Sequence, residues 1–377
     1  MNLVISALHK KFQEEVRNFA QEVIAPRAKE YDRSGKFVLE NVSAMAERGY
    51  LGIPWPKELG GMGLDHLAYA IAVEEISRVC AATGLTLAAH TSLGTYPIYK
   101  FGTEEQKKRF IPPLARGEYL GAFGLTEPNA GSDAAGIETS ARKTERGYIL
   151  NGSKRFITNA GFAGTVIVAA TLDRKLGRKG VTCFVVETKS KGFTVAKEEN
   201  KLGLCGSNTV ELAFEELFVP KENLLGQEYD GYRIFMETLD GGRISIGAFC
   251  LGMAQAALDS LVWWAKGRSF SQGIAKALAN IATEVAAARL LVYDAAMTKD
   301  AGIRADKECA FAKLFASEVA VRAVGTAIST IGEIALTDEL PLARVYRDAK
   351  LGEIGEGTSE IMRLIIAKEV LKETQGG

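Results

Sequence analysis

The chain has few of the residues from which metal centres and disulfide frameworks are built. Only three histidines (His9, His66 and His90) and five cysteines occur in 377 residues, and no two cysteines form a Cys-x-x-Cys pair. Scattered cysteines in odd number argue against both a disulfide framework and a zinc site. A Ser-His-Asp triad would have to use one of the three histidines. We therefore expect reduced core cysteines and no metal ligands.

An excess of charge of either sign is also missing. Lys plus Arg and Asp plus Glu number 46 each, so no global field would recruit nucleic acid or an anionic membrane. No apolar run is expected to span a membrane, and the start of the chain passes into a charged amphipathic helix without a long apolar signal region. These absences predict a cytoplasmic protein whose partners are neither nucleic acids nor membranes.

The order of the predicted elements divides the chain into three domains. Residues 1–121 have the apolar spacing of helices, residues 122–231 alternate with a period of two, and residues 232–377 are Ala-rich and helical again. We expect an α+β multidomain protein with an N-terminal all-α domain, a middle antiparallel β domain and a C-terminal four-helix bundle. The predicted bundle helices are Gly242–Trp264, Ile274–Thr298, Lys307–Thr330 and Thr358–Thr374.

Motifs of the common nucleotide-binding folds are absent. No Gly-x-Gly-x-x-Gly follows a predicted strand, and no phosphate loop with Gly-Lys-Ser/Thr occurs. Strands and helices do not alternate, which argues against a doubly wound sheet. A nucleotide cofactor would have to bind in another way.

A carboxylate stands between two glycines just before the last predicted helix. Glu356 lies between Gly355 and Gly357, so a ligand could approach it closely. Near a helix N-terminus the macrodipole favours the ionised, proton-accepting form of a carboxyl group. The alternative is a solvated loop, since Glu is usually exposed.

A second candidate site opens the predicted β domain. The stretch 122–133, Ala-Phe-Gly-Leu-Thr-Glu-Pro-Asn-Ala-Gly-Ser-Asp, leads from a strand into a Pro- and Gly-rich turn with the hydroxyls of Thr126 and Ser132. Free backbone N–H groups and hydroxyls could bind a flat polar ligand. A plain β-turn explains the same residues equally well.

Together these motifs resemble the acyl-CoA dehydrogenase family, of the short-chain or branched-chain type. The resemblance covers essentially the whole chain, with several independent motifs in the family's order. They are Pro56–Gly63, Ala122–Asp133, Phe156–Asn159, Lys201–Thr209, Asp240–Arg243, Tyr346–Lys350 and the turn around Glu356.

The resemblance implies a cofactor, a reaction and roles for individual residues. Family members bind FAD, take acyl-CoA to the 2,3-enoyl form and pass electrons to a carrier that resembles electron-transferring flavoprotein; we expect a homotetramer or dimer. By position Glu356 is the base. Some relatives carry the base at another position, which Gly242 occupies in this chain. The implied FAD-binding residues are Phe123, Leu125, Thr126, Gly131, Ser132, Phe156, Ile157, Thr158, Arg268, Thr358 and Glu360. The implied substrate-binding residues are Ser132, Asp240, Arg243, Gly355 and Gly357.

Three departures from the family pattern carry further expectations. Gly355 replaces a common Tyr, which predicts a branched, cyclic or otherwise bulky short acyl group. Segments 268–281 and 329–336 lack residues that the family usually carries, and Glu333 adds a carboxylate to the second of them. Because both would contact the ADP portion of FAD across a subunit boundary, we expect altered or weaker binding of that portion.

His90 and Thr91 would contact the acyl end, or only pack between helices.

Two other functions remain open at this level. A redox-silent relative could hold acyl-CoA without turnover if its contact with FAD had decayed. An acyl-CoA oxidase would use oxygen in place of a protein acceptor. The presence of Glu356, Thr126 and Thr158 favours the dehydrogenase, because function is argued from the site.

Overall fold

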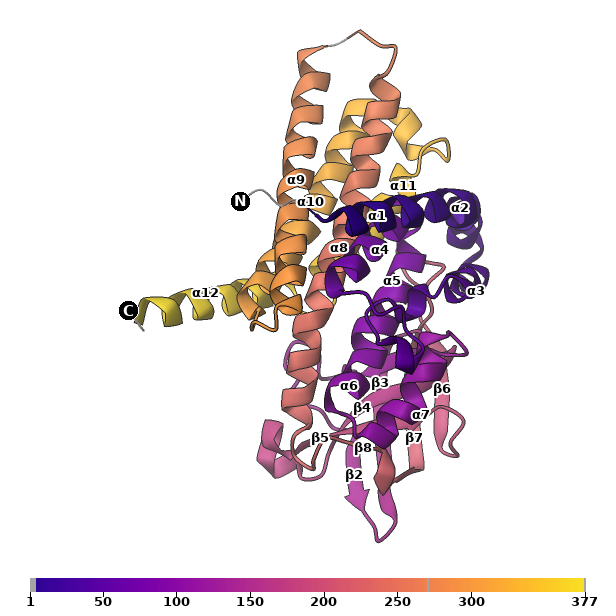
Figure 1. Ribbon diagram of the computed structural model, residues 1–377, viewed down its shortest axis with the longest axis vertical. Coiled ribbons are helices and arrows are strands. Elements are labelled where there is room, and N and C mark those ends of the chain that lie inside the picture. The colour runs from indigo at the N-terminus through magenta and orange to yellow at the C-terminus, as the bar shows by residue number, and fades with distance from the viewer. Residues whose placement is uncertain (1–4, 270, 376–377) are drawn as a thin grey trace.

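The protein is described by a computed structural model that covers residues 5–269 and 271–375. Phe270, within the altered segment 268–281, lies outside the described residues. Helices precede and follow a β-sheet, as the sequence predicts (Figure 1). The N-terminal elements are α1 (Ala7–Phe19), η1 (Ala20–Ile24), α2 (Ala25–Ser34), α3 (Leu39–Glu47), η2 (Tyr50–Gly52), η3 (Lys57–Leu59), α4 (His66–Val79), α5 (Ala81–Ala88), η4 (Ala89–Thr95), α6 (Tyr96–Phe101) and α7 (Glu104–Ala115).

Local sequence signals explain where several of these helices begin. Asp65 caps α4 by accepting a hydrogen bond from the Ala68 N–H at 2.8 Å. Thr103 and Gln106 form a reciprocal capping box at the start of α7. The segments η1 and η4 are π-helical, and η4 lies between α5 and α6.

The middle of the chain forms one sheet of eight strands. Its order is β6-β7-β3-β2-β4-β5-β8, and β1 pairs with β4. Most pairings are antiparallel, as expected, but β1 runs parallel to β4, and β2 meets β4 in parallel at one residue pair. The strands are β1 (Leu120–Gly124), β2 (Ser140–Lys143), β3 (Gly147–Thr158), β4 (Ala163–Thr171), β5 (Val181–Glu187), β6 (Phe193–Glu198), β7 (Thr209–Pro220) and β8 (Leu224–Leu225), with short helical turns η5 (Arg174–Gly180) and η6 (Lys221–Asn223).

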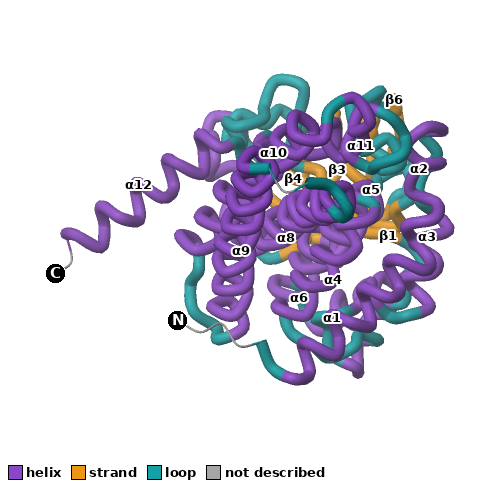
Figure 2. The backbone as a smooth tube through the Cα atoms, turned by 90° about the horizontal axis from the view of Figure 1, so that it is seen from above, coloured by secondary structure: helices purple, strands orange, loops and turns teal. Residues whose placement is uncertain are grey.

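The C-terminal helices pack around one long central helix. In Figure 1 α8 rises from the sheet through the bundle, α9 descends beside it and α10 rises again. The predicted fourth helix forms, but α12 packs on α10 near its start and then extends away from the body (Figure 2). The elements are α8 (Gly231–Ala265), α9 (Gln272–Asp300), α10 (Asp306–Ile331), η7 (Glu333–Leu336), α11 (Leu342–Ala349), η8 (Lys350–Glu353) and α12 (Ser359–Gln375).

Two described helices correct the expectation about apolar length. By length and composition alone, α8 and α10 are long and apolar enough to cross a membrane. The share of the apolar window buried inside the fold is 83% in α8 and 44% in α10. In α8 this apolar character therefore belongs to a core helix.

Two stretches that carry the family resemblance meet at a junction between domains. The carboxylate of Asp348, in α11, accepts a hydrogen bond from the Leu204 N–H at 2.5 Å. The neighbouring Arg347 pairs with Asp32 in α2 and donates to the Leu202 carbonyl at 3.1 Å. These bonds join the helical domains to the loop before β7.

The helical and β parts approach most closely where η4 crosses β1. A Cβ atom added to Gly94 would lie 2.4 Å from the carbonyl carbon of Gly121, so no side chain fits between the two backbones. His90 adds a polar link, since its Nδ1 accepts a hydrogen bond from the Gly121 N–H at 3.0 Å. Its ring is buried, which lowers the pKa of His90 to about 4 and favours the packing interpretation over contact with substrate.

This crossing gives a first prediction. Replacing Gly94 with Ala should destabilise the protein by about 2 kcal/mol, because the new methyl group meets only backbone atoms, which cannot rotate away. A lower melting temperature would report the loss. Gly325→Ala is the matched control, since an added Cβ there meets nothing within 4 Å in α10 and Ala favours helix. Equal melting temperatures for the two variants would contradict the prediction.

Candidate active site

Glu356 lies in a tight turn between η8 and α12. Its φ angle is 53° and that of Gly357 is 100°, a left-handed backbone that is costly for a residue with a side chain. The Gly355 N–H donates to the Leu351 carbonyl at 2.8 Å, and the Lys313 ammonium donates to the Gly357 carbonyl at 2.5 Å. The Glu356 N–H has no acceptor among the described residues. The turn is therefore held on both sides, with one backbone donor left free.

The Glu356 carboxylate points to the middle of α8. A Cβ atom added to Gly242 would lie 1.9 Å from Glu356 Oε2, so the carboxylate occupies the space above that glycine. Oε2 is buried and has no hydrogen-bond partner among the described atoms. An unpaired carboxylate oxygen is free to accept a proton from a ligand.

Burial controls the protonation of this carboxyl group. It raises the pKa of Glu356 to about 7, while the positive charges of Lys313 and Arg243 oppose the rise. The effect expected from the N-terminus of α12 is thus outweighed by desolvation. At neutral pH both protonation states are populated, which suits a group that must accept a proton and release it again.

Side chains from two helices lie beside the carboxylate. Leu93 of η4 reaches the same space above Gly242 as Glu356 does. Behind it, the hydroxyls of Ser92 and Ser245 lie 3.1 Å apart, and Ser245 donates to the Gly242 carbonyl at 2.8 Å. The wall beside Glu356 is therefore built from η4 and α8 and is fixed by buried hydroxyl groups.

The predicted Asp240–Arg243 pair forms one turn along α8. The two side chains are ion-paired, with 27% and 7% of their surfaces exposed. Burial raises the pKa of Asp240 to about 6, and the Arg243 charge opposes the rise. Lys299 lies beside them, with its ammonium 4.1 Å from the centre of the Tyr96 ring. Of these groups, Arg243 acts on the Glu356 carboxyl group with its positive charge.

The predicted flavin loop is anchored by β3. The ammonium of Lys154, fully buried, donates to Glu127 Oε1 at 2.6 Å and to the Leu125 carbonyl at 3.2 Å. The Arg155 N–H donates to the Thr126 carbonyl at 2.9 Å. The Thr126 hydroxyl itself has no hydrogen-bond partner in residues 5–269 and 271–375. Its neighbours are fixed, so this hydroxyl is available at a rigid position.

The end of β3 presents the second flavin motif. Phe156 has a φ angle of 58° and is 57% exposed, with the Arg155 guanidinium carbon 4.8 Å from its ring centre. The half-buried Thr158 has no side-chain hydrogen bond within the described part of the chain. Ile157, also predicted as a cofactor residue, is buried in the sheet core, so its side chain points away from Phe156 and Thr158.

Other predicted residues are not brought to this place. Arg268 follows the far end of α8, about 35 Å along the helix axis from Gly242 by the rise per residue. Its guanidinium carbon lies 4.5 Å from the centre of the Trp264 ring. The segment around Glu333 lies at the same end of the bundle (Figure 1). The weaker binding of the ADP portion of FAD that we expect at this end of the bundle remains a prediction.

The remaining predicted residues are exposed, packed against the core or at a capping position. Gly131 and Ser132 are exposed, and Phe123 lies next to Phe235, with ring centres 4.6 Å apart. The Thr358 hydroxyl accepts a hydrogen bond from the Ile361 N–H at 3.4 Å and thereby caps α12. Glu360 is exposed, and its bond with Thr358 lowers the pKa of Glu360.

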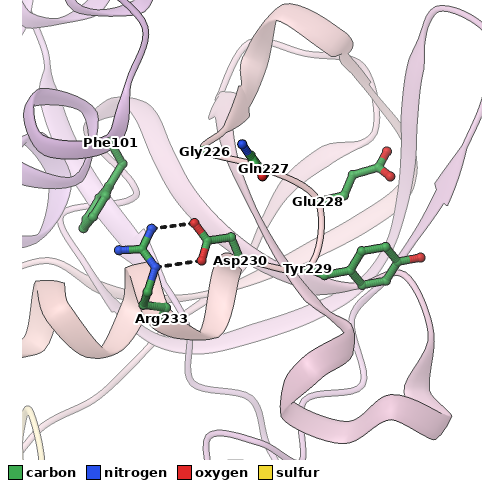
Figure 3. Close-up of a pocket in the computed structure, with 7 residues that line it drawn as sticks. All are labelled: Phe101, Gly226, Gln227, Glu228, Tyr229, Asp230 and Arg233. Carbon is green, nitrogen blue, oxygen red and sulfur yellow. Dashed lines mark hydrogen bonds and ion pairs between the residues drawn. The ribbon is translucent and has the colours of Figure 1, made fainter.

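A surface cavity of about 540 Å³ lies elsewhere (Figure 3). It is bounded by Phe101, the loop 226–230 and Arg233, whose guanidinium pairs with Asp230. None of the predicted site residues lines it.

Lys313 is a site residue that the sequence interpretation missed. It lies on α10 with its side chain fully buried and reaches the Gly357 carbonyl. The available signal was a single Lys within the apolar stretch Ala310–Ala316, on the face of the helix that carries the other buried residues.

Comparison with known proteins gives matches over nearly the entire chain. Models of the acyl-CoA dehydrogenase N-terminal, middle and C-terminal domains match residues 6–118, 122–217 and 229–371. The short-chain specific acyl-CoA dehydrogenase of Clostridium acetobutylicum is 45% identical, over 95% of this chain and 96% of that protein.

Two solved structures have nearly the same fold. Butyryl-CoA dehydrogenase from Megasphaera elsdenii is 40% identical with a TM-score of 0.96, over 98% of this chain and 100% of that one. A chain in a structure reported as the electron transferring flavoprotein of Acidaminococcus fermentans is 42% identical with a TM-score of 0.96, at the same coverage.

Proposed function

The chain belongs to the acyl-CoA dehydrogenase family, and we propose that Glu356 is the base that removes the α-proton of a short, branched or otherwise bulky acyl-CoA. As a family member the protein is an oxidoreductase that acts on a CH–CH bond of an acyl-CoA with FAD as cofactor. The observation that carries the proposal is the Glu356 carboxylate, whose buried Oε2 has no hydrogen-bond partner among the described residues and whose pKa burial raises to about 7.

The residues at the end of β1 and β3 fit a flat, polar cofactor. The hydroxyls of Thr126 and Thr158 have no hydrogen-bond partner in the described part of the chain, and Phe156 exposes an aromatic ring beside them. These three side chains would hold the ring system of FAD, and Gly131 and Ser132 would approach its edge. When bound, FAD supplies the acceptor for the hydride that leaves the β-carbon. The chain's own task is then to hold the thioester and to take the α-proton.

The free backbone donor at Glu356 has a place in this chemistry. Loss of the α-proton moves negative charge onto the thioester oxygen, which a preorganised N–H stabilises. The Glu356 N–H is without an acceptor among the described residues and belongs to the same residue as the base. We assign it to the thioester oxygen, while Arg243 and Asp240 would orient the rest of the CoA ester.

The turn also supports the proposed shape of the acyl group. A Cβ atom added to Gly355 would meet only Leu351 within 4 Å, and its nearest atom would lie at an ordinary contact distance of 3.4 Å. A branch near the α-carbon would use the room that a larger residue would fill. The related short-chain and butyryl-CoA enzymes support a short chain.

Substitution of Gly355 by Tyr tests this assignment. We expect kcat/KM for isobutyryl-CoA to fall at least tenfold relative to butyryl-CoA, because the phenol ring takes the space of the branch. The measurement is a panel of linear, branched and cyclic acyl-CoAs assayed by flavin bleaching. Ile354→Tyr is the matched control, since Ile354 is exposed in the same turn. An unchanged ratio between the two substrates would rule out Gly355 as the selective position.

The electron acceptor separates the dehydrogenase from an oxidase. We propose a soluble carrier that resembles electron-transferring flavoprotein, and a homotetrameric enzyme. A flavin band that bleaches anaerobically with acyl-CoA and recovers with such a carrier supports this. Stoichiometric peroxide in air would point to an oxidase, and a colourless protein that binds CoA esters would point to a redox-silent relative.

A further inference from the structure

Lys313 is a buried cation without a carboxylate partner. Its side chain is fully buried on α10, and within residues 5–269 and 271–375 it forms no ion pair. Its one described hydrogen bond goes to the Gly357 carbonyl, at 2.5 Å. Removing an ammonium group from water costs several kcal/mol, and an apolar side chain of similar size would avoid that cost. The position therefore has a use other than stability.

The hydrogen bond acts on the backbone next to the base. Glu356 and Gly357 both have positive φ angles, so the turn is strained and needs support from outside. By holding the Gly357 carbonyl, the ammonium restricts rotation of that peptide group. The direction of the Glu356 side chain towards Gly242 depends on this backbone conformation.

Charged and titratable groups reach this region from every neighbouring element. Arg243 and Cys250 approach from α8, Glu353 from η8 and Tyr69 from α4. Burial lowers the pKa of Lys313, while Cys250 and Glu356 oppose this effect. For Glu356 the opposing cations are Lys313 and Arg243, with Lys313 the larger of the two.

We propose that Lys313 is a positioning residue for the reaction: its ammonium clamps the catalytic turn through the Gly357 carbonyl and supplies positive charge beside the Glu356 carboxylate. The inference rests on the proposed role of Glu356 as the base. It assigns two separable effects to one side chain, a hydrogen bond and a charge.

The two effects predict different changes in the pH profile. Loss of the charge raises the pKa of Glu356, so a smaller fraction is ionised at pH 7 and the acid limb of kcat/KM moves to higher pH. The rate then recovers at alkaline pH. Loss of the hydrogen bond leaves the turn free to move and lowers the plateau itself, since small misplacement of a catalytic group is costly.

Three variants of the FAD-loaded enzyme test this with butyryl-CoA between pH 5.5 and 9.5. Lys313→Gln keeps a donor without charge, and we expect the acid limb to move up by about one pH unit with a plateau within a few-fold of wild type. Lys313→Met loses both, and the plateau should also fall by roughly ten- to a hundredfold. Lys313→Arg should restore the acid limb towards the wild-type position.

A nearby exposed lysine provides the control. Lys350 pairs with Glu353 in the same region but does not reach Gly357, so Lys350→Met should leave the profile unchanged. Bound FAD and melting temperature identify misfolded variants, and if Lys313→Met fails to fold, the limb shift of Lys313→Gln decides. Wild-type profiles for the Gln and Met variants would overturn the inference. If Glu356→Gln is active, the base assignment fails instead, whatever the Lys313 variants do.

Discussion

Substitution of Glu356 by Gln should lower kcat by about 10² to 10⁴-fold, because the amide cannot accept the α-proton. Binding of acyl-CoA should persist, since the amide is nearly the same size and the N–H of the turn remains. The measurement is the anaerobic bleaching rate of the flavin after mixing with butyryl-CoA, with ligand affinity taken from the spectral shift. Glu353→Gln, in the adjoining η8, is the matched control. A Glu356→Gln enzyme within threefold of wild type would remove the base assignment.

The stability of the wild-type protein should depend on pH in the opposite sense to its activity. The folded-state pKa of Glu356 is raised to about 7, above the ordinary value of 4.5. A raised carboxyl pKa means that folding stability is highest below the unfolded value and is lost as pH rises through 7. The neutral amide avoids this loss. Glu356→Gln should therefore melt above wild type at pH 8.5, and the gap should shrink at pH 5.

Substitution of Glu74 by Gln should destabilise the fold by about 3 kcal/mol, the largest stability effect that we expect. Glu74 is buried on α4, accepts hydrogen bonds from Arg289 Nε at 3.0 Å and Nη2 at 2.7 Å, and accepts another from the Tyr293 hydroxyl at 2.7 Å. The amide leaves the Arg289 charge without compensation. These bonds join α4 to α9, so their loss loosens the N-terminal helices from the bundle.

The Glu74 prediction is measured by chemical denaturation of the FAD-loaded protein. Glu118→Gln is the control, because its pair with Arg116 is exposed on both sides and such pairs contribute little. A loss below 1 kcal/mol for Glu74→Gln, or an equal loss for the control, would contradict the assignment.

Much of the fold follows from local sequence patterns. Apolar spacing and capping residues place α3, α4 and α7 within a few residues of their observed bounds. Alternation finds the long strands β3 and β7, because one face of each is buried. The parallel pairing of β1 with β4 is not found this way, since about 40 residues separate the two strands and no local pattern encodes their direction.

The site was predictable in part. Glu356 is recognisable because its flanking glycines and its family motif are contiguous in sequence. Lys313 contacts the same turn only because α10 packs against it in the fold. A local sequence pattern therefore does not predict its role. The π-helical form of η4, which brings Leu93 beside Glu356, likewise results from packing against α8 and β1. Arg268 lies far from Glu356 because α8 is long, and a sequence motif does not predict that distance.

The contact between Gly94 and Gly121 lets the substrate specificity of the enzyme change without a change in the reaction. Because backbone meets backbone there, a side chain at Gly94 or Gly121 would change the spacing between η4 and β1. Under the proposed assignment, substitutions at Leu93 and Gly355 would admit other acyl groups while this spacing stays the same. We therefore expect relatives that share this backbone contact to acquire new substrates by single substitutions, with the geometry of the reaction unchanged.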